Sequence, residues 1–169
     1  MTLKLLGIVG FKNAGKTTLT ERLVSELTAR RYRISTVKHA HHAFDIDQEG
    51  RDSWRHRQAG ASEVAIVSAN RWALVHELRG TPEPTLHEIV SKLAPCDLVL
   101  TEGYKWEKHP KIEVRNVTLA HPELAGKDST VIAIAANGVI ENSPVPVFDR
   151  ENVKSIADFI VARMDLARP

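Results

Sequence analysis

The residues with the clearest chemistry form one loop near the start of the chain. Residues 10–17 read G-x-x-x-x-G-K-T, and they follow the apolar run at residues 5–9. Glycines in such a loop let successive backbone N–H groups close around phosphate oxygens. We expect Lys16 to contact the terminal phosphates as a catalytic cation and the Thr17 hydroxyl to bind magnesium. The residues expected to hold the nucleotide phosphates are Gly10, Asn13, Ala14, Gly15, Lys16, Thr17 and Thr18.

A second candidate group lies at the end of the short apolar run at residues 97–101. Glu102 follows this run, where a phosphate loop needs an acidic partner that holds magnesium and orients the attacking group. We therefore assign Glu102 a metal-binding and catalytic role. Gly103 would let the backbone turn close to the phosphates, and Asp97, at the other end of the run, is interpreted as structural. The alternative for Glu102 is a solvated loop carboxylate.

The third candidate group is the polar stretch at residues 38–47, which follows a predicted strand. In open α/β sheets ligands sit at the carboxyl ends of the strands, so this stretch should share an edge with the phosphate loop. Lys38 is expected to meet phosphate, Asp45 to act as a catalytic loop ligand, and Asp47 to bind the nucleotide or its metal. Two alternatives stay open: a polar surface loop without a role, and a zinc site. Zinc is disfavoured because the three histidines lack the spacing of a closed site. They are His39, His41 and His42.

The elements that must position these residues follow an α/β pattern, in which apolar runs alternate with helical periodicity. Strands are predicted at 5–9, 33–37, 97–101, 112–114, 131–135 and near 147, and helices at 17–30, from 52 or 53 to near 60, 85–93 and 152–163. The second helix is expected to be capped by Asp52 or Ser53, the third by a capping box of Thr85 and Glu88, and the last by Asn152. We expect a mostly parallel sheet covered by helices on both faces. The runs at 64–67 and 72–77 break the alternation and predict a β-hairpin attached to that sheet. The chain is interpreted as one domain over residues 1–169, with a hairpin insertion at about 62–80.

Composition excludes several classes of function. A net charge of +2 over 169 residues gives no general affinity for nucleic acid. A single cysteine permits no internal disulfide and suits a reducing compartment. The sequence shows neither a signal-peptide pattern nor a run of 18 apolar residues. The expectation is a cytoplasmic protein that has no membrane or nucleic-acid partner.

Taken together in order, these segments resemble the molybdopterin-guanine dinucleotide biosynthesis protein B (MobB) family over roughly residues 5–160. The resemblance is carried by the phosphate loop, by the run K-H-A-H-H with Asp45 and Asp47, and by E-G-Y-K at 102–105 with P-K-I-E at 110–113. It also includes G-R-D-S at 50–53, G-A at 60–61 and R-W-A-L at 71–74.

This resemblance implies a P-loop protein that binds GTP and magnesium, forms a homodimer and hydrolyses GTP slowly at most. Members assist the molybdopterin guanylyltransferase and act beside the molybdenum-insertion enzyme, so molybdopterin or its guanine dinucleotide is a further candidate ligand. Lys105 and Lys111 would border the nucleotide or cofactor site. The hairpin offers exposed edge strands that can pair with a second copy.

Two departures concern recognition of the base. Family members often carry aspartate where this chain has Asn137, and asparagine cannot make a charged bidentate contact to guanine. The Asn-Lys-x-Asp motif that commonly reads guanine is absent from the sequence. The preference for GTP over ATP therefore rests on the resemblance.

The main alternative is a small-molecule kinase that uses ATP or GTP. Such an enzyme needs an arginine-rich lid that closes over the phosphates and excludes water. Arg51, Arg55 and Arg57 in one short predicted helix are the candidates for that lid. A solvated or phosphate-attracting helix face explains the same three residues.

Overall fold

The computed structural model describes residues 3–40 and 44–167 and divides the chain into two compact units. The main unit comprises residues 1–39 and 89–169, and the second unit comprises residues 40–88. Within the described ranges, none of the helices is long and apolar enough to cross a lipid bilayer.

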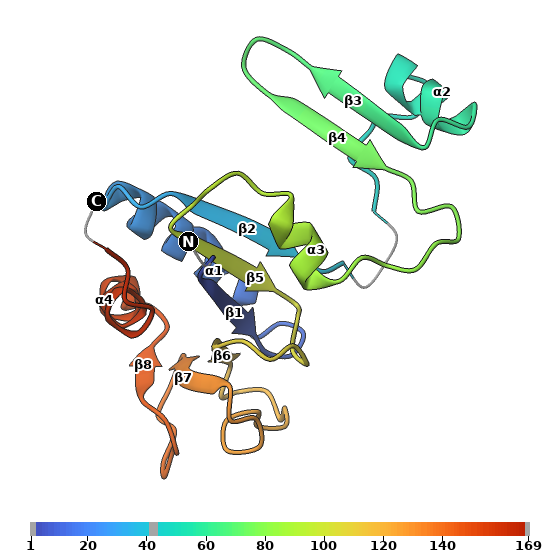
Figure 1. Cartoon of the computed structure of the whole chain (residues 1–169). Coiled ribbons are helices and arrows are strands. Elements are labelled where there is room, and N and C mark those ends of the chain that lie inside the picture. The colour runs from blue at the N-terminus through green and yellow to red at the C-terminus, as the bar shows by residue number, and fades with distance from the viewer. Residues whose placement is uncertain (1–2, 41–43, 168–169) are drawn as a thin grey trace. The chain divides into compact units, whose positions relative to one another are not determined.

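The main unit contains a six-stranded parallel sheet (Figure 1). Its strands are β1 (Leu5–Val9), β2 (Ile34–Lys38), β5 (Leu98–Glu102), β6 (Lys111–Arg115), β7 (Val131–Ala136) and β8 (Val147–Asp149). Their order is β2-β5-β1-β6-β7-β8, and every neighbouring pair is parallel. The predicted mostly parallel α/β sheet is confirmed. The three strands that end in candidate site residues, β1, β5 and β2, are neighbours.

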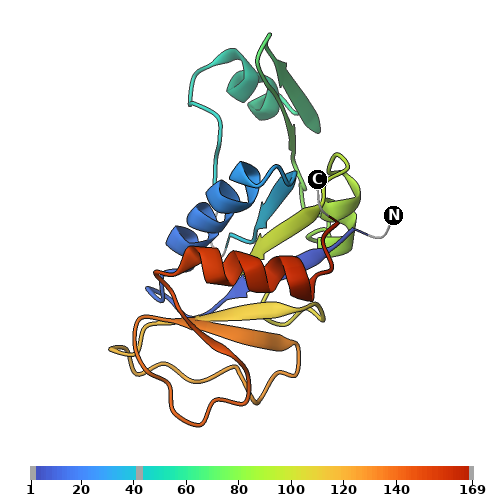
Figure 2. The same ribbon diagram turned by 90° about the vertical axis from the view of Figure 1, so that its left-hand side faces the viewer.

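Helices α1 (Lys16–Ala29) and α4 (Val153–Arg163) pack on one face of this sheet (Figure 2). In α1, buried leucines recur every four residues at positions 19, 23 and 27, which places them on one helical face. Helix α4 begins as predicted, because the Asn152 side chain accepts a hydrogen bond from the Ser155 N–H at 3.2 Å. Its Ile156 and Ile160 are fully buried. The two helices therefore fix the position of the phosphate loop, which precedes α1.

The opposite face is covered differently. The end of α3 (Leu86–Ser91), residues 89–91, lies across β5 from α1 (Figures 1 and 2). Over β7, loop residues such as Leu124 and Val145 form a smaller apolar cluster. Beneath it, β6 turns Lys111 and Glu113 inward, and each is only 1% exposed. Apolar periodicity cannot reveal such charged positions inside a sheet.

The second unit consists of α2 (Asp52–Gln58), the antiparallel pair β3 (Glu63–Val67) and β4 (Trp72–His76), and their connections. The hairpin is confirmed, but its predicted attachment to the main sheet is wrong: β3 and β4 form a separate two-stranded sheet. The predicted capping of α2 by Asp52 or Ser53 is also wrong. Arg51 occupies the N-cap position in an extended conformation, with no side-chain cap.

Helix α3 begins with the capping box that the sequence predicted. The Thr85 hydroxyl accepts a hydrogen bond from the Glu88 N–H at 3.2 Å. In return, the Glu88 carboxylate accepts from the Thr85 N–H at 2.7 Å. These reciprocal bonds form a capping box, and α3 follows it directly.

Candidate functional site

The phosphate loop connects β1 to α1 in the main unit and has the backbone that its sequence requires. A Cβ at Gly10 would lie 2.5 Å from the carbonyl oxygen of Val114, so only glycine fits there. Asn13 has a φ of 63°, in the left-handed region that asparagine tolerates better than most residues. The chain then enters α1 at Lys16, whose helix N-terminus carries a partial positive charge toward the loop.

Three of the predicted residues meet at the start of α1. The Thr17 hydroxyl donates to Oε1 of Glu102 at 2.9 Å, which joins the loop to the end of β5. Nζ of Lys38, at the end of β2, lies 4.0 Å from the same carboxylate oxygen. The Glu102 side chain is 12% exposed and that of Lys38 is 64% exposed. The structure thus gathers a hydroxyl, a carboxylate and a flexible cation around one point.

Lys16 lies in the same group. Its Nζ donates to the backbone oxygen of Phe11 at 2.9 Å, so the side chain folds back over the loop. Burial lowers the pKa of Lys16, the carboxylate of Glu102 acts to raise it, and Lys105 and Lys38 lower it further. A phosphate ligand would stabilise the charged form of this partly desolvated ammonium, because an anion offsets the repulsion from the two other cations.

Gly103 lies where the end of β5 passes the end of β2. A Cβ at this position would lie 3.1 Å from the backbone oxygen of His39. The N–H of His39 also donates to the Glu102 carbonyl at 2.9 Å. The glycine therefore allows the end of β5 to pass close to the end of β2, which brings Lys38 and Glu102 together.

Two further side chains touch the phosphate loop, and no sequence motif predicted either of them. Nε2 of His121 lies 3.0 Å from the Lys12 carbonyl oxygen, and its ring stacks on Phe11 with centroids 5.3 Å apart. Arg150, which follows β8, donates from Nη1 to the Ala14 carbonyl oxygen at 2.7 Å. Both residues come from connections distant in sequence, so no local motif could have identified them.

The lysines that the resemblance placed at the site border have different environments. Nζ of Lys105 lies 4.0 Å from the centroid of the Phe11 ring, so this cation borders the loop as expected. The expectation for Lys111 is wrong, because this residue is 1% exposed and its Nζ pairs with Asp128 at 2.9 Å. Lys111 is thus a structural residue of the sheet.

Asn137 bridges the ends of two strands. Its Oδ1 accepts from the Val117 N–H at 2.9 Å, and its Nδ2 donates to Oδ1 of Asn116 at 2.8 Å. These bonds use one donor and one acceptor of the amide. The residue therefore holds the segment after β6 against the end of β7.

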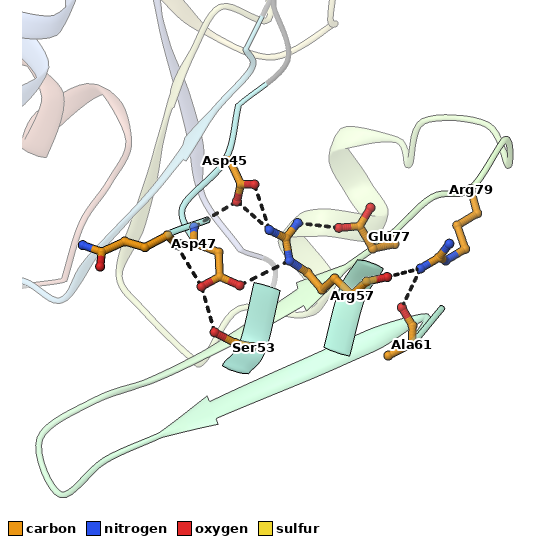
Figure 3. Close-up of polar contacts among 8 residues, drawn as sticks. Asp45, Asp47, Ser53, Arg57, Ala61, Glu77 and Arg79 are labelled. Atoms are coloured by element: carbon orange, nitrogen blue, oxygen red, sulfur yellow. Dashed lines mark hydrogen bonds and ion pairs between the residues drawn. The ribbon is translucent and has the colours of Figure 1, made fainter. Parts of the chain in front are cut away.

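Asp45 and Asp47 belong to the second unit, where both bind Arg57 (Figure 3). Arg57 is 8% exposed and contacts Asp45 at 2.8 Å, Asp47 at 3.3 Å and Glu77 at 2.6 Å. Hydrogen bonds from Arg57 hold the pKa of Asp45 below its usual range. Asp47 also accepts from the Ser53 hydroxyl at 2.8 Å. The two aspartates thus fix their loop to α2, and Arg57 links that helix to Glu77, which follows β4.

The structure therefore brings together Lys16, Thr17, Lys38 and Glu102 in the main unit, and it gathers Asp45 and Asp47 around Arg57 in the second unit. His41 and His42 lie outside the described residues, so the zinc alternative stays untested. Within residues 3–40 and 44–167, no three histidine, cysteine or acidic side chains gather as metal ligands.

Comparison with known proteins agrees with this fold and this loop. Residues 5–137 match the family model described as molybdopterin guanine dinucleotide synthesis protein B. A molybdopterin-guanine dinucleotide biosynthesis adapter protein from Haemophilus influenzae is 41% identical, with 92% of this chain and 86% of the relative covered. The protein of that name from Escherichia coli K12 is 37% identical, with coverages of 95% and 93%. The crystal structure of Bacillus subtilis MobB superimposes with a TM-score of 0.75 at 25% identity, and the match covers 95% of this chain and 98% of that one. The chain therefore belongs to the molybdopterin guanine dinucleotide synthesis protein B family.

Proposed function

We propose that this protein is a nucleotide-binding adapter in molybdopterin-guanine dinucleotide biosynthesis. The observation that carries the proposal is the convergence of Lys16, Thr17 and Glu102 at the start of α1, in a chain whose relatives bear that adapter name. The adapter would hold GTP, or the guanine dinucleotide of the pterin, by its phosphates. It would present that ligand to the guanylyltransferase and the molybdenum-insertion enzyme in the cytoplasm.

Magnesium fits the residues at this point. The ion prefers hydroxyl, carboxylate and phosphate oxygens, and Thr17 and Glu102 present the first two within hydrogen-bond distance of each other. A bound magnesium ion would offset charge on the phosphates and link them to β5. Lys16 would leave the Phe11 carbonyl and donate to phosphate oxygens instead, while the loop amides hold the remaining oxygens.

The kinase alternative is not favoured. Arg57, the only buried arginine of the proposed lid, is held by three carboxylates of its own unit. Its guanidinium is therefore committed to structure and is a poor candidate for closing over phosphates. Without an arginine lid, slow turnover and a binding role are expected. A contribution of Asp45 or Asp47 to the metal remains part of the proposal and would require release from Arg57.

We also propose that two copies associate through the second unit. On one face of the hairpin, Val67 pairs with Trp72 and Ala65 with Leu74. Val67 is 74% exposed, Trp72 70% and Leu74 49%. An isolated two-stranded hairpin is marginally stable in water, and its apolar face and edges invite a second copy of the same hairpin.

The dimer is tested by measuring molar mass in solution by light scattering during size-exclusion chromatography. The double variant Trp72→Glu and Leu74→Glu should shift the protein from dimer to monomer, since two charges would have to be buried. The matched control is Trp106→Glu, which changes a tryptophan that is 85% exposed in the main unit. A monomeric wild type, or a double variant with unchanged mass, would reject the hairpin interface.

The ligand is tested by calorimetric titration of the protein with GTP and ATP in parallel, with magnesium present. Preferential binding of GTP with slow hydrolysis supports the adapter. A second titration adds molybdopterin-guanine dinucleotide to the GTP-saturated protein, and loss of binding heat would show that both share the phosphate loop. Preference for ATP with rapid consumption in the presence of a hydroxyl substrate would favour the kinase instead.

A further inference from the structure

The phosphate loop is supported from outside at two of its carbonyl oxygens. His121 contacts the carbonyl of Lys12 at 3.0 Å, and Arg150 contacts the carbonyl of Ala14 at 2.7 Å. A carbonyl oxygen can only accept, so Nε2 of His121 carries the proton in this contact. The two supported carbonyls are two residues apart and flank Asn13 in the loop.

The orientation of a carbonyl determines the orientation of the amide that follows it. The peptide bond is planar, and in the trans form its C=O and N–H point in opposite directions. The described residues contain no cis peptide bond. A donor that holds the Lys12 carbonyl outward therefore turns the Asn13 N–H to the opposite side, and a donor on the Ala14 carbonyl does the same for the Gly15 N–H.

The two supports are themselves firmly placed. His121 belongs to a segment whose Leu124 and Ala125 N–H groups donate to the Glu113 carboxylate at 3.1 and 2.8 Å. Glu113 is 1% exposed and lies on β6, next to β1. The His121 ring also stacks on Phe11 of the loop.

Arg150 is placed in an equally direct way. Its backbone N–H donates to the carbonyl of Ala136 at 2.8 Å, at the end of β7. Its guanidinium fills the space beside Gly15, where a Cβ would lie 2.6 Å from Nη1. The absence of a side chain at Gly15 is therefore what gives Arg150 access to the loop.

We propose that His121 and Arg150 are positioning residues that turn the Asn13 and Gly15 amides toward the phosphates. Neither residue needs to touch the nucleotide, since each acts through one peptide plane. The orientation then exists before the ligand arrives, so binding does not have to order these two amides. This inference rests on the proposed nucleotide-binding function, and its test has one part that needs no nucleotide.

The first part measures amide orientation in nucleotide-free protein by backbone residual dipolar couplings. His121→Ala should alter the N–H coupling of Asn13 more than that of Gly15, and Arg150→Ala should show the reverse. A general loosening of the fold would not produce this crossed pattern. Unchanged couplings in both variants, or equal changes at both amides, would overturn the inference whether or not GTP binds.

The second part measures GTP affinity by calorimetry with magnesium. Each alanine variant should weaken binding about ten-fold, the effect of losing one well-aimed hydrogen bond to a charged group. His121→Gln should recover part of the loss, because its side-chain amide can still donate to the carbonyl. Arg150→Lys should recover less, since an ammonium lacks the planar fork of donors.

Arg22→Ala is the matched control. Arg22 pairs with Glu151 at 2.6 Å, next to Arg150 in sequence, and no described contact joins its side chain to the loop carbonyls. This variant removes the same charge and should leave GTP affinity within about two-fold, as expected for an exposed ion pair. Equal losses in Arg22→Ala and Arg150→Ala would overturn the specific role of Arg150. A wild type that fails to bind GTP would reject the proposed function but leave the first part intact.

Discussion

The hydroxyl of Thr17 donates a hydrogen bond to Oε1 of Glu102 at 2.9 Å, which joins the first turn of α1 to the end of β5. The two residues are 85 positions apart in the chain, and parallel pairing of β1 with β5 brings them together. This contact connects the phosphate loop to the acidic side chain that the sequence predicted at the carboxyl end of that strand.

The Thr17–Glu102 pair should determine how GTP binding depends on magnesium. Thr17→Val and Glu102→Gln are each expected to weaken magnesium-dependent GTP binding about ten-fold, because each removes one oxygen ligand or its charge. Thr17→Ser retains the hydroxyl and is the matched control. The measurement is GTP titration with magnesium and again with a chelator.

In the chelator, Glu102→Gln should bind GTP as well as the wild type or better. Without the metal, the carboxylate only repels phosphate, so its removal is no longer harmful. A Glu102→Gln variant that is weakened equally with and without magnesium would argue against the metal role.

Lys16 should be essential for nucleotide affinity but not for folding. Lys16→Ala removes a partly buried ammonium that is expected to donate to the terminal phosphates, and affinity should fall about 100-fold. The melting temperature should change little, because no apolar core volume is lost. Lys108→Ala, at an exposed position of the main unit, is the control. Unchanged GTP affinity in Lys16→Ala would reject the phosphate-loop assignment.

Replacing Lys111 and replacing Asp128 should lower the free energy of unfolding by different amounts. Lys111 is 1% exposed, whereas the Asp128 side chain is 27% exposed. Asp128→Asn leaves a buried cation without its counter-charge and should cost about 2–3 kcal/mol of unfolding free energy. Lys111→Met leaves a carboxylate that can reach water and should cost less. Urea unfolding of both variants gives the comparison, and a larger loss in Lys111→Met would contradict this explanation.

His109 should make the stability of the main unit depend on pH. Burial lowers the pKa of His109 below its ordinary value, and the charge of Lys111 lowers it further. The unfolded chain therefore binds a proton more readily than the folded one. The contribution of neutral His109 to the free energy of unfolding is fully present above about pH 6.5. It falls as the pH drops below that value, by at most about 1.4 kcal/mol per pH unit.

The pH effect is measured as the difference between wild type and His109→Gln in urea unfolding at pH 7.5, 6.5 and 5.5. Glutamine can keep a hydrogen bond to Thr101, which the histidine ring contacts at 3.0 Å, but it does not titrate. The stability of wild type relative to the variant should decline from pH 6.5 to 5.5. A difference independent of pH would mean that folding leaves the pKa of His109 unchanged, which would contradict this prediction.

Sequence alone determined the features that depend on local rules. The glycine spacing of residues 10–17 defines a phosphate loop wherever a strand precedes it and a helix follows it. The leucine periodicity of α1 and the caps at Asn152 and Thr85 follow from interactions within a few residues. The end of an apolar run also placed Glu102 correctly, since parallel strands finish at a common edge.

Only the tertiary structure decided which distant side chains reach the loop and which charged residues are buried. His121 and Arg150 approach from connections that follow β6 and β8, and nothing in their local sequence marks them. The family resemblance placed Lys111 at the border of the site, whereas the structure buries this residue and pairs it with Asp128. The hairpin likewise appeared to extend the main sheet, because edge pairing is a long-range choice that periodicity cannot specify. Residue patterns within a few positions determine which segments form helices, strands and loops. Packing between segments that are distant in sequence determines which partner each polar side chain contacts.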